Sequence, residues 1–396
     1  MTVWRTLPFF VGAAFALGGC VTASPVGHSA TRAGADCSTE LARIAFDVET
    51  APQSTCTVLG ERAFAILVTP EHAPPINPSP WYAFRYKASG TEGISIRLDY
   101  LGGRHRYPPK IVRGADITPL LVEVSNNGRT AQFALPPGEG IVSAQEPFGA
   151  MHYAQLVDRL AALPQADRIE LGRSLDGRPI ATVRFGNRAA PALVVLLGRQ
   201  HPPETTGAVA MEAFLLELTE QLVAHPDLGE RIQFLAVPEL NPDGVARGHW
   251  RANRGGIDLN RDWGKFSQPE TRAVKAWLDE LPDTVRPVAM LDFHSTGRNL
   301  FYVQSEGEMD EREKEFLEGW LGRKETAMGD YPFVIERRIA NPGLGTAKNW
   351  FHQIYDIPAY TYEVGDETRP DAIQRSARSL ARSYVVQLDS LVRKAR

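Results

Sequence analysis

The chain has 396 residues, of which 43% are hydrophobic and 23% are charged, the composition of an ordinary globular protein. A domain size of roughly 150 residues allows two or three domains in this length. The 43 Lys and Arg residues against 47 Asp and Glu residues leave a net charge of -4. No basic stretch stands out, so the composition argues against a nucleic-acid-binding protein.

The first 19 residues resemble a secretory signal peptide. Arg5 precedes an apolar core, residues 7–17, that is too short for a membrane span. The ending LGGC resembles the bacterial lipobox, which implies that Cys20 carries lipid as the first residue of the mature chain. The alternative is an ordinary signal peptide with an incidental cysteine. The small and polar residues 20–37 suit a flexible tether, so we expect an exported lipoprotein facing the periplasm, at the outer membrane in a Gram-negative bacterium.

Two cysteines remain after Cys20, namely Cys37 and Cys56. An even pair in an exported protein is compatible with one disulfide. Separation along the chain does not show whether the two thiols meet, so a bridge and two free cysteines are both open at this point.

Residues 38–150 have the pattern of a small β-sandwich domain. Runs such as RAFAILVTP and GISIRLDYLGG alternate with turn residues. In the second run, Ile94, Ile96 and Leu98 recur at every second position, the period of a half-buried strand. The NNG stretch at 126–128 predicts a tight hairpin turn. No helix-period segment of useful length interrupts these runs, so we expect an all-β domain.

From residue 151 to 396, helices and strands alternate. HYAQLVDRLAAL and GAVAMEAFLLELTEQLVAH have helical character, whereas ALVVLLG, IQFLAVPEL and VAMLDFHS have the composition of buried strands. Such alternation predicts an α/β domain with a mixed, largely parallel sheet flanked by helices. The sequence therefore predicts two folded domains behind the tether.

Polar residues follow three of these strands in turn. His201 and Glu204 come just after ALVVLLG, NPDG at 241–244 follows IQFLAVPEL, and His294 with Ser295 closes VAMLDFHS. Ligands gather beyond the carboxyl ends of strands in α/β folds. Two imidazoles and a carboxylate form the ligand set of an open catalytic zinc site. Either histidine alone would more simply be a loop or core residue, but their shared position at strand ends favours a metal site.

The second half of the chain resembles the M14 zinc carboxypeptidases over roughly residues 151–390. The resemblance depends on five ordered blocks more than on any one of them. The blocks are His-x-x-Glu at 201–204, NPDG at 241, RANRGGIDLNRDW at 251–263, DFHS at 292 and YTYE at 360. GRSLDGRPI at 172–180 also resembles the opening strand of that family.

The resemblance implies that His201, Glu204 and His294 bind one zinc ion per chain, since two histidines and one glutamate form the site of carboxypeptidase A. It implies that Glu363, in YTYE, is the general base that takes a proton from the zinc-bound water and later gives one to the leaving amine. Zinc lowers the pKa of water toward neutrality, so a nearby carboxylate can shuttle protons at ordinary pH. Without the resemblance, Glu363 would be only a carboxylate at a strand end.

The segment HWRANRGGIDLNRDW holds three arginines, Arg251, Arg254 and Arg261. A solvated charged loop is the simpler interpretation, but the tryptophans at its two ends indicate a loop packed onto the domain, where unpaired guanidinium groups are costly. The family pattern implies that Arg254 polarises the scissile carbonyl and stabilises the oxyanion. It also implies that Asn260 and Arg261 clamp the terminal carboxylate of the substrate, as an exopeptidase requires.

Counting back from Glu363, the family position at the base of the side-chain pocket falls on Lys348, because Trp350 matches a tryptophan of the pancreatic enzymes at the same separation. A lysine there favours an acidic terminal side chain by Coulomb attraction. The alternative is a surface lysine on a helix that begins near Thr346. The same count places Asn341 where the pancreatic enzymes carry a mobile tyrosine that caps the substrate, which leaves open how tightly the terminal residue is held.

The N-terminal half resembles the β-sandwich of the cytosolic-carboxypeptidase branch of M14, chiefly through WYAFRY and the strands after it. Better-known members of that branch trim glutamates, which agrees with Lys348. An exported protein would not meet their cytosolic partners, so we expect peptide or protein C-termini in general as substrates. Two alternatives stay open: a zinc amidase or carboxypeptidase acting on cell-wall peptides or N-acyl amino acids, and an inactive protein that binds chain termini.

Overall fold

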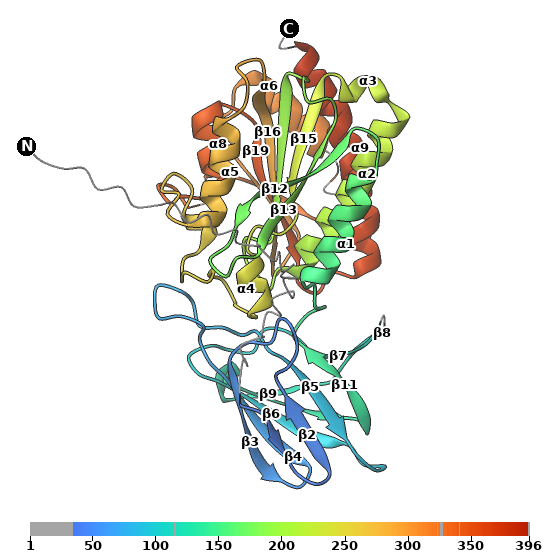
Figure 1. Cartoon of the computed structure of the whole chain (residues 1–396), viewed down its shortest axis with the longest axis vertical. Coiled ribbons are helices and arrows are strands. Elements are labelled where there is room, and N and C mark those ends of the chain that lie inside the picture. The colour runs from blue at the N-terminus through green and yellow to red at the C-terminus, as the bar shows by residue number, and fades with distance from the viewer. Residues whose placement is uncertain (1–34, 115, 323, 325–327, 340, 395–396) are drawn as a thin grey trace, which may run out of the picture. The chain divides into compact units, whose positions relative to one another are not determined.

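The computed structural model describes residues 35–114, 116–322, 324, 328–339 and 341–394. These residues belong to one compact unit, in which a β-sandwich precedes an α/β domain (Figure 1). The predicted signal peptide, Cys20 and nearly all of the predicted tether lie outside the described residues. Within the described part of the chain, no helix is both long and apolar enough to cross a membrane.

The sandwich consists of two sheets with strands in an interleaved order. One sheet, in the order β1-β2-β5-β11-β7-β8, contains β1 (Cys37–Ser38), β2 (Ala42–Ala45), β5 (Ala83–Ala88), β11 (Gly138–Ser143), β7 (Lys110–Arg113) and β8 (Asp116–Pro119). The other, in the order β3-β4-β6-β10-β9, contains β3 (Ser54–Gly60), β4 (Ala63–Val68), β6 (Ile94–Tyr100), β10 (Thr130–Leu135) and β9 (Glu123–Ser125). Neighbouring strands are antiparallel except for β4 and β6. The predicted all-β fold is confirmed.

Local sequence explains the sandwich well. Ile94, Ile96 and Leu98 of β6 are buried, as their alternation predicted, because side chains of one strand face opposite sides of a sheet. The predicted hairpin joins β9 to β10 through residues 126–128, all three with positive φ. Cys37 and Cys56 form a disulfide between β1 and β3, so the open question of their pairing is resolved in favour of the bridge.

The α/β domain contains one mixed sheet in the order β12-β13-β15-β14-β16-β19-β17-β18. Its strands are β12 (Ala166–Arg173), β13 (Pro179–Phe185), β14 (Ala192–Gly198), β15 (Ile232–Val237), β16 (Arg286–Thr296), β17 (Leu300–Val303), β18 (Val334–Arg337) and β19 (Ala359–Gly365). The four central strands, from β15 to β19 in this order, are mutually parallel. GRSLDGRPI therefore forms the end of β12, a turn and the start of β13.

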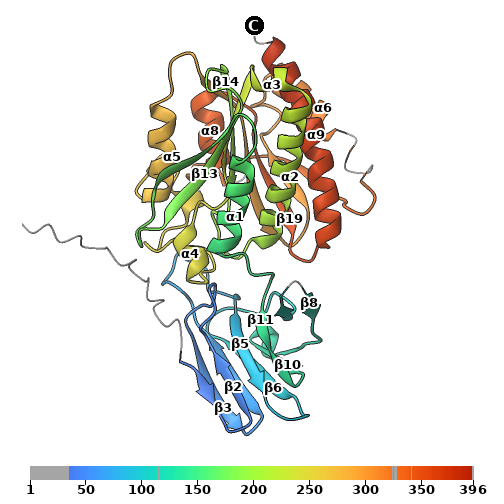
Figure 2. The same cartoon turned by 45° about the vertical axis from the view of Figure 1, so that its right-hand side comes forward.

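Helices cover both faces of this sheet (Figures 1 and 2). The longer helices are α1 (Ala150–Ala161), α2 (Thr205–Ala224), α5 (Pro269–Asp279), α6 (Glu311–Leu321), α8 (Ala347–Tyr355) and α9 (Pro370–Lys394), with short α3 (Pro226–Gly229) and α4 (Pro242–Ala246) between them. In β14, Val194 and Leu196 pack with α1, α2, α6 and α9, whereas Leu193, Val195 and Leu197 pack with α5 and α8. β14 is thus buried on both sides, which explains its continuous apolar run.

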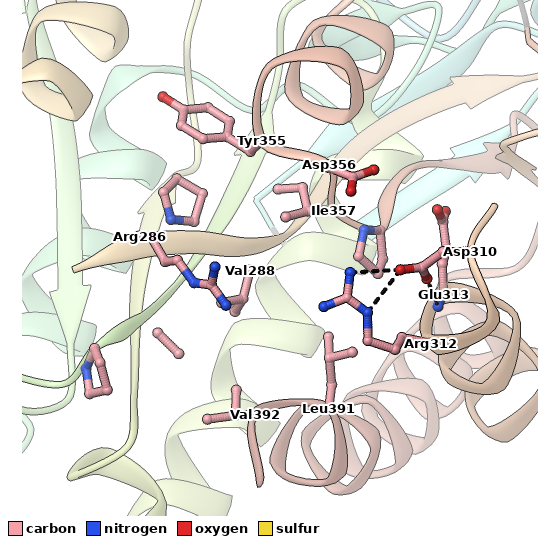
Figure 3. A pocket seen from close by; sticks show the side chains of 14 residues that line it. Arg286, Val288, Asp310, Arg312, Glu313, Tyr355, Asp356, Ile357, Leu391 and Val392 are labelled. Carbon is pink, nitrogen blue, oxygen red and sulfur yellow. Dashed lines mark hydrogen bonds and ion pairs between the residues drawn. The ribbon is translucent and has the colours of Figure 1, made fainter. Parts of the chain in front are cut away.

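The sandwich has its own apolar core, separate from the clusters on the two faces of the large sheet. The two ends of the parallel strands differ in what they carry. Their carboxyl ends bear the polar residues singled out in the sequence. Their amino ends border a cavity of about 460 Å³, lined in part by Arg286, Arg312 and Leu391 (Figure 3).

Candidate metal centre

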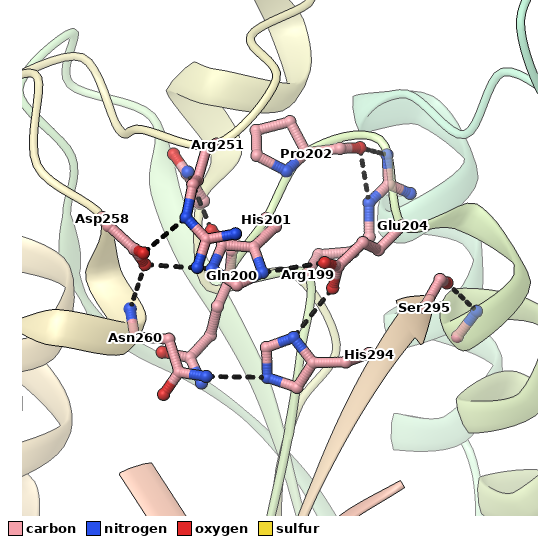
Figure 4. Close-up of polar contacts among 12 residues, drawn as sticks. Arg199, Gln200, His201, Pro202, Glu204, Arg251, Asp258, Asn260, His294 and Ser295 are labelled. Atoms are coloured by element: carbon pink, nitrogen blue, oxygen red, sulfur yellow. Dashed lines mark hydrogen bonds and ion pairs between the residues drawn. The ribbon is translucent and has the colours of Figure 1, made fainter. Parts of the chain in front are cut away.

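His201, Glu204 and His294 converge beyond the carboxyl ends of β14 and β16 (Figure 4). His201 Nδ1 lies 2.8 Å from Glu204 Oε1, and His294 Nδ1 lies 2.8 Å from Glu204 Oε2. Candidate ligand atoms of the three residues lie within 4.8 Å of one another. Residues 90 positions apart in the sequence therefore present two ring nitrogens and a carboxylate to one point, as the sequence predicted.

The start of helix α2 fixes this geometry. Glu204 is the residue directly before α2, and Ser295 Oγ accepts hydrogen bonds from the Gly207 N–H and the Thr206 hydroxyl, both at 2.8 Å. A Cβ on Gly207 would lie 2.5 Å from the carbonyl oxygen of His294. Glycine at this position therefore allows the helix and the strand end to approach closely.

A buried carboxylate lies behind each histidine. His201 Nε2 is 2.9 Å from Asp258 Oδ1, and His294 Nε2 is 2.7 Å from Asp292 Oδ2. Metal-binding histidines commonly use their second ring nitrogen in this way, which fixes the ring and makes the ligand more basic. Each Nδ1 is thereby left as the ligand atom, and the donor set suits zinc.

The metal centre also contains two carboxylates with lowered pKa values. Burial alone would raise the pKa of Glu204, but the adjacent His201 and His294 outweigh it and hold that pKa well below its usual range. Burial would also raise the pKa of Asp258, but His201 and Arg251 outweigh it and bring that pKa below its usual range. Both carboxylates are therefore ionised at neutral pH, and their charges can compensate that of a bound dication.

Glu363 lies directly beside this cluster. It is paired with His294 in the register of the parallel strands β16 and β19. Its Oε2 atom is buried and has no hydrogen-bond partner among the described residues. Burial raises the pKa of Glu363 to about 7. A carboxylate in this condition can accept a proton near neutral pH.

Asn260 and Arg261 lie on the side of the cluster that faces α8. Asn260 Oδ1 accepts the N–H of Ala347 at 2.9 Å, and its Nδ2 lies 3.3 Å from His294 Nε2. Arg261 Nη1 donates to the Asn260 carbonyl at 2.6 Å. The two predicted clamp residues are thus brought together beside the histidines.

Two arginines of the arginine loop have different surroundings. Arg251 Nε donates to Asp258 Oδ2 at 2.6 Å, so one carboxylate joins this guanidinium to His201. The side chain of Arg254 is 48% exposed, and its nearest carboxylate, Asp176, is 3.5 Å away. Arg251, to which the sequence analysis gave no role, is therefore linked to His201 through Asp258. The role that the family pattern implies for Arg254 stays a prediction.

Lys348 is buried, so the alternative of a surface lysine is wrong. It is 1% exposed, and its Nζ donates to the Val303 carbonyl at 3.2 Å and to Gln304 Oε1 at 3.0 Å. Burial lowers its pKa to about 8. The helix does begin after Thr346, as expected, with the threonine hydroxyl accepting the N–H of Asn349. Asn341 is exposed and has a positive φ of 57°.

One further contributor, Glu71 of the sandwich, was not identified from the sequence. The backbone N–H groups of Trp250, Arg251 and Ala252 all donate to its carboxylate, at 2.8 Å for Arg251 and 2.7 Å for Ala252. Three consecutive amides on one carboxylate fix the path of the arginine loop. Asp292 was also missed, although its position two residues before His294 in a strand places both on one face.

Comparison with known proteins agrees with this site. The profile of the zinc carboxypeptidase family, Peptidase_M14, matches residues 153–387. An uncharacterized protein of Zymomonas mobilis is 33% identical over 139 residues, which cover 34% of this chain and 36% of that protein. Cytosolic carboxypeptidase 6 of Mus musculus is 26% identical over 230 residues, which cover 51% of this chain and 42% of that protein. The chain thus matches less than half the length of these two relatives.

Solved structures show the same fold. A metallo-carboxypeptidase from Burkholderia cenocepacia has a TM-score of 0.73 at 18% identity, over 88% of this chain and 99% of that one. A metallo-carboxypeptidase from Pseudomonas aeruginosa, in complex with (2-guanidinoethylmercapto)succinic acid, has a TM-score of 0.70 at 20% identity, with the same coverage. Because the family match covers more than half of the chain and includes every residue of the metal cluster, the protein belongs to the zinc carboxypeptidase family, which implies zinc as its metal.

Proposed function

We propose that this protein is a zinc-dependent carboxypeptidase that releases the C-terminal residue of peptides, with acidic residues preferred. One observation carries the proposal. Two histidine Nδ1 atoms and Glu204 converge on one point, each histidine is backed by a buried carboxylate, and the unpartnered Oε2 of Glu363 is buried beside them.

In this proposal, His201, Glu204 and His294 would hold zinc, which would lower the pKa of a water molecule and polarise the scissile carbonyl. Glu363 Oε2 accepts a proton from the attacking water as its oxygen adds to the carbonyl carbon. When the C–N bond breaks, Glu363 returns a proton to the leaving amine nitrogen. The raised pKa of Glu363 suits a group that must both accept and donate a proton.

The other residues bind and orient the substrate. Asn260 and Arg261 hold the terminal carboxylate, for which a forked guanidinium is well suited. We assign stabilisation of the developing oxyanion to Arg254, as the family pattern implies, because the guanidinium of Arg251 is already bound to Asp258 behind His201. A cationic donor directed at the developing charge is the usual basis of such stabilisation.

Lys348 supports the acidic preference. The buried ammonium group of Lys348 donates hydrogen bonds to a backbone carbonyl and to an amide oxygen. Among the described residues, no carboxylate accepts a hydrogen bond from it. An acidic terminal side chain entering this pocket would supply one, with a strong Coulomb attraction because water is excluded. The same pocket should discriminate against basic terminal residues.

We also propose that the chain is exported and tethered through lipid on Cys20, on the basis of its N-terminal sequence. A Cys20→Ser variant is expected to leave the membrane fraction after cell lysis. Continued membrane retention of this variant would contradict the lipid anchor.

The deciding experiment combines metal analysis with peptide hydrolysis. Wild-type protein is expected to hold one zinc per chain and to release single residues from a peptide library varied only at its last position. Glu363→Gln should retain zinc and lose activity by about 10²- to 10⁴-fold, the usual contribution of a general base. Zinc binding without release of any L-residue would overturn the proposed substrate, and a protein that binds no zinc would overturn the site.

A further inference from the structure

Arg106 of the β-sandwich lies against the segment that follows Glu363. It belongs to the loop between β6 and β7, and its Nε and Nη2 donate to Asp366 Oδ2 at 2.9 and 2.7 Å. Asp366 comes directly after β19, and its N–H donates to the Thr296 carbonyl at the end of β16. A residue of the N-terminal domain thus lies near the carboxyl ends of the two strands that carry His294 and Glu363.

Aromatic rings hold the guanidinium in place. Its central carbon lies 5.2 Å from the centre of the Tyr107 ring and 5.0 Å from that of Trp250, both within the range of cation–π attraction. Trp250 directly precedes Arg251 in the arginine loop. The side chain of Arg106 is still 33% exposed, whereas Asp366 is only 11% exposed. Arg106 is therefore fixed in orientation and yet reachable from solvent.

The metal ligand Glu204 lies within electrostatic range of Arg106. Burial would lower the pKa of the Arg106 guanidinium, but the surrounding charges, including those of Asp366 and Glu204, raise it instead. Glu204 likewise adds to the effect of burial in raising the pKa of Asp366 to about 6. Asp366 is three residues after Glu363, and its N–H donates to Thr296, two residues after His294. Arg106 and Asp366 therefore lie near the metal centre.

One edge of the guanidinium remains available. A guanidinium has five N–H donors in a fixed fork. Asp366 occupies the edge formed by Nε and Nη2, while Nη1 makes no hydrogen bond to any described residue. The edge formed by Nη1 and Nη2 can therefore donate hydrogen bonds to a second carboxylate, and the largely buried Asp366 keeps that edge oriented.

We propose that Arg106 is a specificity residue that binds an acidic side chain of the substrate upstream of the scissile bond. This inference depends on the proposed carboxypeptidase function. The terminal residue is assigned to Asn260, which contacts the start of α8, to the adjacent Arg261, and to Lys348 of α8, which contacts β17. The preceding residues of the substrate would therefore extend toward other elements around the metal. Arg106, with its contacts to Trp250 and Asp366, lies among those elements. The β-sandwich thereby contributes directly to substrate recognition.

The test uses pairs of pentapeptides that end in Glu and differ only in whether the two preceding residues are Glu or Gln. For Arg106→Gln, we expect KM for the Glu-containing peptide to rise about tenfold, the effect of losing one charge-assisted hydrogen bond. KM for the Gln-containing peptide and kcat for both should stay unchanged. Arg85→Gln is the matched control, because Arg85 is also a sandwich arginine paired with an aspartate, Asp47 at 3.1 Å, but is 48% exposed.

A second variant separates recognition from stability. Arg106→Gln leaves the buried Asp366 without its partner, so Arg106→Gln combined with Asp366→Asn removes both charges. The double variant should keep zinc and its melting temperature while showing the same loss of selectivity. An equal loss for both peptides, or no loss for either, would overturn the inference.

Binding to zinc-loaded Glu363→Gln distinguishes the two proposals. Calorimetry with the same peptides should show that Arg106→Gln weakens binding of the Glu-containing peptide only. One outcome is that the wild type releases terminal residues while Arg106→Gln has the same KM and binding as the wild type for both the Glu-containing and the Gln-containing peptide. In that case only the inference about Arg106 fails. If no peptide is cleaved by the wild type and none binds to the zinc-loaded Glu363→Gln protein, the proposed function fails and this inference fails with it.

Discussion

The two ends of the parallel strands both carry charged side chains, but they use them differently. At the carboxyl end, the charged side chains form one connected network, as when Asp258 joins Arg251 to His201 and Glu204 joins His201 to His294. At the amino end, Arg312 pairs with Asp310, only two residues away, beside a cavity of about 460 Å³ (Figure 3). A cavity of ligand-binding size is thus not where the polar groups converge. In this fold, a network of fixed charged side chains indicates the candidate active site better than the volume of a cavity does.

The largest effect is a difference in kcat between variants of two arginines in the same loop, Arg251 and Arg254, at the carboxyl end. Arg254→Gln should lower kcat by about 10²- to 10³-fold, as loss of an oxyanion donor does. Arg251→Gln should lower kcat less, because its guanidinium is held by Asp258 behind His201. Steady-state kinetics at full zinc occupancy compare the two. A greater loss for Arg251 would move the oxyanion role to that residue.

The next largest effect is expected on zinc affinity, when a carboxylate that contacts a metal-binding histidine is removed. Asp258→Asn is expected to weaken zinc binding about 10- to 100-fold, because the partner behind a metal-bound histidine orients its ring. Competition with a chelator measures the affinity. Asp310→Asn at the amino end is the matched control, because asparagine also caps a helix and no zinc ligand is in contact there. Equal zinc affinity in both variants would contradict the distinction between the two ends.

The preference set by Lys348 should depend on pH. Burial lowers its pKa to about 8, so the ammonium is charged below that pH and neutral above it. The ratio of kcat/KM for Glu-terminal over Gln-terminal peptides should therefore fall on the order of tenfold as pH rises through about 8. Glu363 acts on both peptides alike, so its own titration cancels in the ratio. Lys348→Met should show a low ratio at every pH; a ratio that follows wild type would remove Lys348 from the pocket.

The smallest effect is expected at the amino end. Arg286 lines the cavity but lies at the opposite end of β16 from His294. Arg286→Ala should leave zinc content, kcat and KM unchanged within error. A clear change in any of these would show that the cavity and the metal centre are coupled through the strands.

Much of this architecture follows from local sequence. The alternation in β6, the continuous apolar run of β14 and the polar residues at strand ends predicted a sandwich, a mixed sheet and a group of polar side chains at one edge of that sheet. These features depend on the periods of strands and helices and on the rule that parallel strands end at one edge of a sheet. The order of the family blocks added the ligand set His201, Glu204 and His294 and the role of Glu363.

The side-chain partners were decided by the tertiary structure alone. Arg251 and Arg254 are three residues apart in one loop, and only the path of that loop, held by Glu71, determines which guanidinium reaches Asp258. The burial of Lys348 and the approach of Arg106 to Asp366 likewise join segments far apart in the chain. Local periodicity specifies which face a residue occupies, but such contacts arise from the packing of distant segments, for which a single sequence has no local signal.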